Sequence, residues 1–134
     1  MADVSGITAV RPTERTQYRT VLYGATIAAG NCVTMVSTEG VLSDADASLA
    51  LAAVEGIAVT PGVNTGYGLI ANRGSIILVG ATLVVGTVYI ASDTPGGIKP
   101  ITDAGSGDWI TIIGTASTTT QLDLAITRTG VQVP

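Results

Sequence analysis

Residues 24–40, GATIAAGNCVTMVSTEG, have a second version at residues 80–96, GATLVVGTVYIASDTPG. The matching glycines lie 56 positions apart (80 minus 24), and short runs rich in valine, isoleucine and threonine follow them in both copies. β-Branched residues favour strands, and glycine favours the turns between strands. The repeated phrase therefore predicts two copies of one small β unit.

The similarity continues beyond the phrase, with an Asp-rich segment and then an apolar strand that contains a central glycine, at Gly56 and Gly114. The offset there is 58 (114 minus 56), so the second copy has two extra residues. We expect pseudo-repeats of about 56 residues, over 24–79 and 80–127, to pair into one compact β-barrel or β-sandwich, because neither copy can close a core alone. The glycines expected to shape this fold are Gly24, Gly30, Gly40, Gly56, Gly80, Gly86, Gly96 and Gly114.

The rest of the chain from Val21 onward also consists of short apolar runs separated by Gly, Pro, Asn, Asp and Ser. This spacing is typical of an all-β domain. In QLDLAIT the apolar residues Leu122, Leu124 and Ile126 alternate with polar ones, as in a strand that has one face in solvent.

Two stretches could be mistaken for helices. Residues 43–53, SDADASLALAA, can be capped as a helix, but their counterpart in the second copy is a loop, so we expect a loop with at most one helical turn. Residues 74–91 carry no charge over a length that approaches a membrane span. Their three glycines and many β-branched residues instead favour two buried strands joined at Gly80.

Residues 1–20 lack the strand rhythm, contain Pro12 and carry three of the six basic residues. We expect an extended N-terminal arm here, followed by a single β domain over 21–134. An extended arm can bind a partner through its main chain and a few side chains. The candidate contact residues are Arg11, Arg15, Tyr18 and Arg19.

The composition indicates a protein that assembles. The 134 residues are 46% hydrophobic and only 12% charged, which is more apolar surface than a small monomer hides easily. We therefore expect an oligomer or a permanent partner. The net charge of -4 argues against nucleic-acid binding, which needs clustered Lys and Arg.

Residues with catalytic chemistry are scarce. The sequence has no His, which removes Ser-His-Asp and Cys-His systems, and its single cysteine, Cys32, lies in an apolar run where a buried thiol is expected. The acids Asp44, Asp46, Asp103 and Asp108 could offer oxygens to Ca²⁺, but they lack EF-hand spacing and are better interpreted as solvated turn acids. We predict no catalytic residue, cofactor, metal or small-molecule substrate.

Two segments together carry a family resemblance: AAGNCVTMVSTEGVLSDADAS at 28–48 and AAVEGIAVTPGVNTGYGLIANRGSIILV at 52–79. Their glycine placement and strand rhythm resemble the capsid decoration, or cement, proteins of tailed bacteriophages. The resemblance covers about residues 20–127 and includes no catalytic signature.

The resemblance implies a structural virion protein. Such a protein would be made in the host cytoplasm and would dock, usually as a homotrimer, on the exterior of the capsid. It would stabilise the head by cross-linking neighbouring major capsid subunits, with its N-terminal segment taking part. No enzyme activity, nucleic acid or membrane enters this function.

Two other functions remain open at the sequence level. A carbohydrate- or receptor-binding β module of a phage fibre or tail would need an exposed aromatic cluster. A biotinyl or lipoyl carrier domain would need a lysine at a hairpin tip, for which Lys99 is the sole candidate. The aromatic residues available for the cluster are Tyr18, Tyr23, Tyr67, Tyr89 and Trp109.

Overall fold

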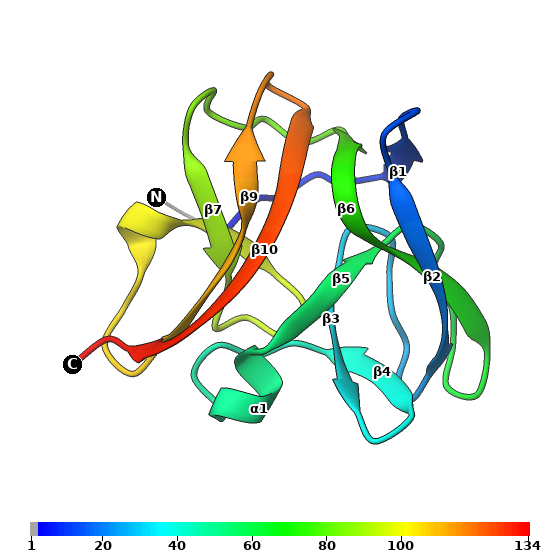
Figure 1. Cartoon of the computed structure of the whole chain (residues 1–134), viewed down its shortest axis with the longest axis horizontal. Helices are drawn as coiled ribbons and strands as arrows, with labels where there is room; N and C mark the ends of the chain where they lie inside the picture. The colour runs from blue at the N-terminus through cyan, green and yellow to red at the C-terminus, as the bar shows by residue number, and fades with distance from the viewer. Residues whose placement is uncertain (1–2) are drawn as a thin grey trace.

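The computed structural model describes residues 3–134, of which nearly all regular structure is β-strand (Figure 1). Strand accounts for 51% of the chain and helix for 5%, which confirms the predicted all-β class. The helical elements are α1 (Leu49–Ala52) and the 3-10 turn η1 (Ile101–Asp103). The strands are β1 (Ala9–Pro12), β2 (Gln17–Tyr23), β3 (Cys32–Val36), β4 (Glu39–Leu42), β5 (Val54–Ala58), β6 (Tyr67–Val79), β7 (Val88–Ala91), β8 (Ile98–Pro100), β9 (Trp109–Ala116) and β10 (Gln121–Gln132).

Five strands close into a barrel in the order β2-β4-β3-β5-β6, and β6 pairs again with β2. The β2–β4 pairing is parallel and the others are antiparallel. Closure leaves no free edge in this half. The side chains that fill the barrel are Val21, Tyr23, Ile27, Val33, Ala58 and Ile70, so the interior is a packed core rather than a cavity.

The second half of the molecule is a sheet that continues from β6 in the order β6-β10-β9-β7-β8. In Figure 1 its strands β7, β9 and β10 stand beside the barrel, and β6 belongs to both parts. The larger apolar core lies under this sheet and includes Ile76, Leu78, Tyr89, Ile113 and Leu122. The shared strand joins the two parts into one folded unit.

β6 runs without a break over 13 residues. At its centre Gly74 has a φ of +80°, and a Cβ atom there would lie 1.9 Å from the carbonyl oxygen of Arg15. The turn at 13–16 crosses β6 at this point, and both Thr13 and Thr16 hydrogen-bond to Ser75. Glycine thus lets one strand pass from the barrel into the second sheet.

A separate N-terminal arm is not confirmed. β1 pairs with the last four residues of β6, which lie beyond the part of β6 that pairs with β2. Val10 of β1 lies in the core with 7% exposure. Ahead of β1, the Val4 N–H donates to the Ile98 carbonyl and the Thr8 N–H donates to the Val79 carbonyl, both at 2.8 Å. The N-terminal segment therefore ties β8 to β6, because an unpaired strand edge is available there.

The two predicted repeats share a strand order. Strands β4-β3-β5-β6 of the first half are neighbours in the same succession as β8-β7-β9-β10 of the second. Val33 pairs with Gly56 in the first half and Tyr89 with Gly114 in the second, and each pair is followed by a register shift. The equivalent residues thus hold equivalent places in the two ladders.

Hydrogen bonds at the start of each half also correspond. The Gly30 N–H donates to the Ala58 carbonyl and the Gly86 N–H donates to the Ala116 carbonyl, each at 2.8 Å. Both glycines have a positive φ. The pseudo-repeats are nevertheless not confirmed over their predicted bounds, 24–79 and 80–127, since β6 serves both halves. Duplication of an ancestral unit stays a prediction.

The two ambiguous stretches are resolved. Within residues 43–53 only the four-residue helix α1 forms, capped by the Ser48 hydroxyl, which accepts a hydrogen bond from the Leu51 N–H at 3.1 Å. Residues 74–91 form the end of β6, a turn beginning at Gly80, and β7, as predicted. In the part of the chain that the structure describes, no helix has the length and apolarity to cross a membrane.

Candidate functional site

The four predicted contact residues are all exposed, but they do not form one patch. Arg11 lies on β1 and Arg15 in the turn between β1 and β2. Tyr18 and Arg19 are neighbours on β2, and successive side chains of a strand point to opposite faces. Arg19 lies 3.8 Å from the carboxylate of Glu55, so it belongs to a different surface from Tyr18.

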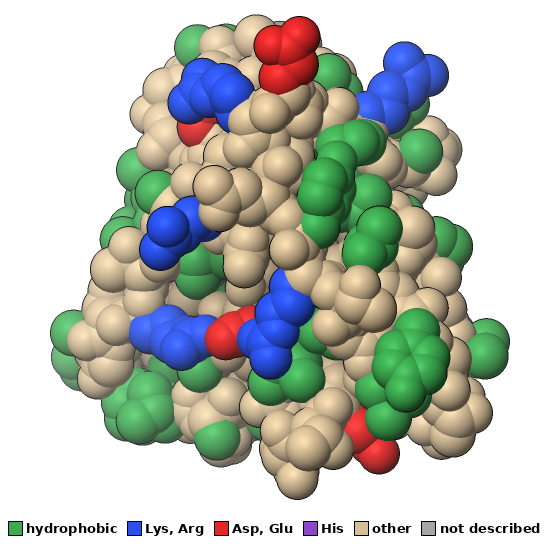
Figure 2. All heavy atoms as spheres, turned by 45° about the vertical axis from the view of Figure 1, so that its right-hand side comes forward, with side chains coloured by type: hydrophobic (Ala, Val, Ile, Leu, Met, Phe, Trp, Pro, Cys, Tyr) green, Lys and Arg blue, Asp and Glu red, His purple; other side chains and the backbone are tan. Residues whose placement is uncertain are grey.

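An exposed apolar strip follows the outer wall of the barrel along β2 and β6. We define it by Tyr18, Leu22, Tyr67 and Leu69, of which Tyr18 is 44% and Tyr67 is 73% exposed. The register opposes Leu22 to Tyr67 and places Leu69 beside Thr20, so these side chains share one face of two paired strands. Figure 2 shows apolar side chains running down one half of the surface. Exposed apolar area of this kind is typical of binding surfaces.

The aromatic cluster needed by a carbohydrate module is not assembled. Tyr23 and Tyr89 are buried, and Trp109 is partly buried at the start of β9. The exposed tyrosines, Tyr18 and Tyr67, are opposite Ala71 and Leu22, so they are separated by four residues along β6, or roughly 13 Å. That separation exceeds the width of one sugar ring, so the two tyrosines do not stack on the same sugar.

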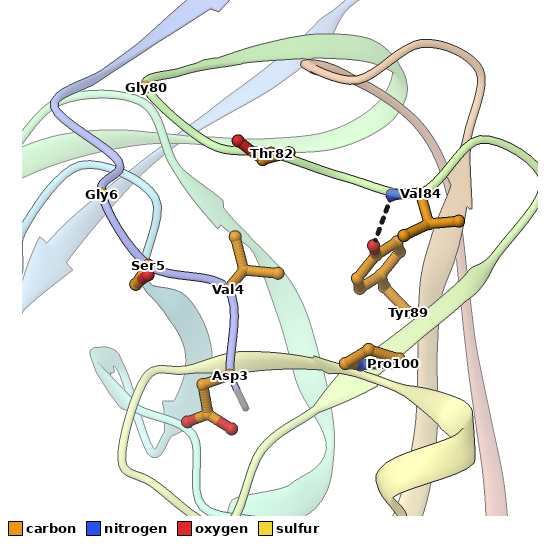
Figure 3. A pocket seen from close by; sticks show the side chains of 9 residues that line it. All are labelled: Asp3, Val4, Ser5, Gly6, Gly80, Thr82, Val84, Tyr89 and Pro100. Atoms are coloured by element: carbon orange, nitrogen blue, oxygen red, sulfur yellow. Dashed lines mark hydrogen bonds between the residues drawn. The ribbon is translucent and has the colours of Figure 1, made fainter. Parts of the chain in front are cut away.

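A hollow of about 400 Å³ lies between the N-terminal segment and the chain that follows β6 (Figure 3). In Figure 3 the Tyr89 hydroxyl points to the loop, where it accepts a hydrogen bond from the Val84 N–H at 2.9 Å. The Asp3 carboxylate accepts from the Ser92 hydroxyl at 2.8 Å. The described residues that line the hollow are Asp3, Val4, Ser5, Gly6, Gly80, Thr82, Val84, Tyr89 and Pro100, a set without a nucleophile and base in contact.

A buried ion pair joins β8 to the loop before β9. The Lys99 ammonium is 2.6 Å from Asp108 Oδ2 and 3.3 Å from Asp93 Oδ1, and Lys99 and Asp108 are only 4% and 2% exposed. The Gly105 N–H also donates to Asp108 Oδ2 at 2.8 Å. The interpretation of Asp108 as a solvated turn acid is therefore wrong, because the preceding glycine-rich loop folds it inward onto Lys99.

The same geometry removes the carrier-domain hypothesis. A lysine that accepts a biotinyl or lipoyl group must be reachable by a ligase, and its ammonium must lose its charge and its partners to react. Lys99 is enclosed in β8 rather than placed at a hairpin tip, and two carboxylates hold it. It is a structural residue.

Three carboxylates around Lys99 resemble a metal site at first sight. Oxygens of Asp46, Asp93 and Asp108 lie within 4.8 Å of one another. The Lys99 ammonium already supplies the positive charge at Asp93 and Asp108. The cluster is thus an ion-pair network, and it gives no support to a metal site.

Charge coupling in this network shifts three pKa values. Burial alone would lower the pKa of Lys99, but its hydrogen bond and attraction to Asp108 prevail and raise it. Desolvation alone would raise the pKa of Asp93, but the attraction and hydrogen bond from Lys99 outweigh it, so the pKa is lowered. The pKa of Asp46 is raised, first by its interaction with Asp44, then by desolvation and by repulsion from the neighbouring carboxylates. The ionised form of Asp46 is therefore disfavoured in the folded protein.

The single thiol is inert, as the sequence predicted. Cys32 is fully buried in β3, and burial raises its pKa to about 12. The reactive form of cysteine is the thiolate, which such a site does not contain at neutral pH.

The predicted glycines contribute to the fold rather than to a site. Gly30, Gly80, Gly86 and Gly96 have positive φ values. The other four sit where a side chain would meet a neighbour within 3 Å, and the closest contact is between Gly114 and the carbonyl oxygen of Asp123. The full set is Gly24, Gly30, Gly40, Gly56, Gly80, Gly86, Gly96 and Gly114.

Comparison with known proteins gives no family assignment. No protein-family model and no curated protein matches the chain. The resemblance to capsid decoration proteins therefore stays a prediction, and function is inferred from the surfaces described above.

Proposed function

We propose that this chain is a capsid decoration protein of a tailed bacteriophage. In this function it binds the outer surface of the head and stabilises the shell by holding neighbouring major capsid subunits. The observation that supports it best is the exposed apolar strip on the wall of the closed barrel, in which Tyr18 and Tyr67 are exposed and Leu22 and Leu69 are half-buried. The choice of this family comes from the glycine and strand pattern of residues 28–79, which resembles that of capsid decoration proteins.

The mechanism is linkage and needs no catalytic group. A ligand that binds only the assembled shell stabilises that shell by mass action. A homotrimer, as the resemblance implies, would present three copies of the strip, and its second and third contacts would form at high effective concentration. The arginines on and after β1, Arg11 and Arg15, extend the binding surface beyond the strip.

The alternative, a carbohydrate- or receptor-binding module, is less well supported. Its aromatic platform would have to come from Tyr18 and Tyr67 alone, because Tyr23 and Tyr89 are enclosed in the cores. Specific glycan binding on an array, together with no binding to heads, would favour that alternative over capsid decoration.

The test uses heads purified from the phage whose genome encodes the chain and stripped of this protein. We expect the wild-type protein to co-sediment with the heads and to protect them against heating or dilution. Tyr67→Ser should weaken binding by about tenfold, the effect typical of losing a central aromatic contact. Val131→Ser, at an exposed apolar position on β10 outside the strip, is the matched control and should bind normally. Wild-type protein that leaves the heads undecorated would refute the proposal.

The oligomeric state is tested separately by sedimentation equilibrium of the free protein. A mass three times that of the 13.4 kDa chain supports the homotrimer. A monomer over the concentration range at which heads are decorated would contradict a trimer that forms before docking.

A further inference from the structure

A groove opens on the surface where β5 and β10 separate from β6. On this edge of β6, β5 pairs with Ile70 and Ala71, and β10 pairs from Gly74 onward. Asn72 and Arg73 lie between these pairings and have no partner strand on this side. The resulting groove has a volume of about 470 Å³ and is lined by Arg19, Val54, Glu55, Asn72, Arg73, Ile126, Thr127 and Arg128.

The groove is positively charged in a protein whose net charge is -4. Arg128 donates from Nη2 to both oxygens of Glu55, at 2.9 and 2.8 Å, and Arg19 lies 3.8 Å from the same carboxylate. Within residues 3–134, the side chain of Arg73 forms no ion pair or hydrogen bond. Two guanidinium groups thus share one carboxylate, and the third, Arg73, has no anionic partner among the described residues. Figure 2 shows basic side chains flanking an acidic one across this face.

Asn72, one of the residues that line the groove, carries an acceptor that lacks a donor. The Oδ1 atom of Asn72 is buried and has no hydrogen-bond partner in the described part of the chain. A buried polar atom without a partner is unfavourable, so a ligand that donates a hydrogen bond to it gains affinity. A fully deprotonated anion such as sulfate offers only acceptor oxygens and would be opposed by this acceptor. A peptide offers both carboxylates for the arginines and main-chain N–H groups for Asn72.

We propose that this groove binds an extended acidic segment of a protein partner. One carboxylate of the segment contacts Arg73, another lies near Arg19 and Arg128, and a main-chain N–H donates to Asn72 Oδ1. Guanidinium suits this ligand, since its planar fork matches a carboxylate. The proposal rests on the proposed function for the identity of the partner, a major capsid subunit, and it adds the chemistry of the segment that is bound.

Nucleic acid fits the groove less well than an acidic peptide. Duplex or single-stranded nucleic acid needs a continuous basic track and stacking side chains. Here Glu55 stands between two of the arginines, and the residues that line the groove include no aromatic side chain.

Fluorescence anisotropy with a labelled hexaglutamate peptide at low salt tests the proposal directly. We expect binding that weakens as salt is added, with hexaglutamine as the neutral control peptide that does not bind. Arg73→Gln should weaken hexaglutamate binding by about five- to tenfold. Thr119→Glu lowers the net charge by one, as Arg73→Gln does, but at an exposed position outside the groove, so it should change binding by less than about twofold.

Further measurements decide the identity of the ligand. Glu55→Gln removes the competing carboxylate and should tighten hexaglutamate binding. Unchanged or weaker binding in Glu55→Gln, an equal loss in Thr119→Glu, or tighter binding of oligothymidylate than of hexaglutamate overturns the proposal. So does full displacement of the peptide by an equal concentration of inorganic phosphate.

The two proposals can fail separately. If wild-type protein binds hexaglutamate but leaves phage heads undecorated, the groove is retained and the capsid function is lost. If wild-type and Arg73→Gln proteins decorate heads equally and neither binds hexaglutamate, the capsid function is retained and the groove is lost.

Discussion

At the scale of single residues, Gly74 shows how one position determines the path of a strand. Its φ is +80°, and a Cβ would lie 1.9 Å from the Arg15 carbonyl oxygen, which belongs to a backbone that cannot move without breaking the turn at 13–16. Gly107 has a similar φ of +89° but no atom within 4 Å of its missing Cβ. Comparing the two glycines distinguishes the cost of an unfavourable backbone conformation, which both share, from the cost of a steric clash, which only Gly74 has.

Gly74→Ala should therefore reduce the free energy of unfolding by roughly 2–4 kcal/mol, because a strained φ and a backbone clash add. Gly107→Ala should cost about 1 kcal/mol from the backbone conformation alone. Urea denaturation of both variants measures the difference. Equal effects in the two variants would show that β6 can bend without a close approach to Arg15.

The buried ion pair makes a second residue-scale prediction. Lys99→Met should destabilise the protein by about 3–5 kcal/mol, because it leaves Asp108 buried and uncompensated. Lys99→Met combined with Asp108→Leu should recover most of this loss. Thermal unfolding measures both, and a double variant no more stable than the single one would indicate that Asp108 is stabilised by the Gly105 N–H instead.

The pH dependence of the same pair follows from the raised pKa of Lys99. Because the pKa of Lys99 is higher in the folded state than its ordinary value of 10.5, the ion pair contributes its full stability below pH 10.5. This contribution is lost as the pH rises through the pKa of Lys99 in the folded protein. Tyr23, whose pKa is raised by burial, adds a loss of the same sign above pH 10.0. Stability measured from pH 9 to 12 should thus fall more steeply for wild type than for the double variant, which isolates the contribution of Lys99.

Asp46 should behave in the opposite way to the buried pair. Its pKa is raised from 3.8, so its ionised form is less favourable in the folded state above that pH. Asp46→Asn should therefore raise the melting temperature at pH 7 and leave it unchanged at pH 3, where wild type is protonated in both states. Glu14→Gln, at an exposed acid in the turn before β2, is the control and should have little effect at either pH. A lower melting temperature for Asp46→Asn at pH 7 would contradict the repulsion.

At the scale of elements, the sequence predicts where strands form better than it predicts which strands pair with one another. Alternation in QLDLAIT predicts the buried Leu122 and Leu124, and glycine spacing predicts the turns, because both depend on local geometry. The pairing of β1 with β6 depends on an edge that exists only after the barrel closes. The groove likewise joins Arg19, Arg73 and Arg128 from three strands, and their spacing along the chain gives no sign of it.

β1 makes a prediction of its own. Deletion of residues 1–12 should destabilise the protein by more than about 3 kcal/mol, because it uncovers the last four residues of β6 and removes Val10 from the core. A synthetic peptide of residues 3–14 should raise the melting temperature of the truncated protein, and the same peptide with Val10→Asp should not. A truncated protein as stable as wild type would restore the interpretation of this segment as an independent arm.

At the scale of the whole molecule, the two surfaces that carry the proposals lie on different parts of one folded unit. The exposed apolar strip runs along the barrel wall, and the groove opens where the barrel meets the second sheet. β6 contributes Tyr67 and Leu69 to the first and Asn72 and Arg73 to the second. A partner that contacts both is held in a fixed orientation.

The central place of β6 also orders events during synthesis. All five barrel strands have been translated once the ribosome has passed Val79, before β7 exists. Until β10 is made, Gly74–Ile77 of the nascent chain present an unpaired edge, since those residues pair with the last strand of the sequence. The half-made protein is thus the form most open to chaperone capture or to pairing between neighbouring nascent chains.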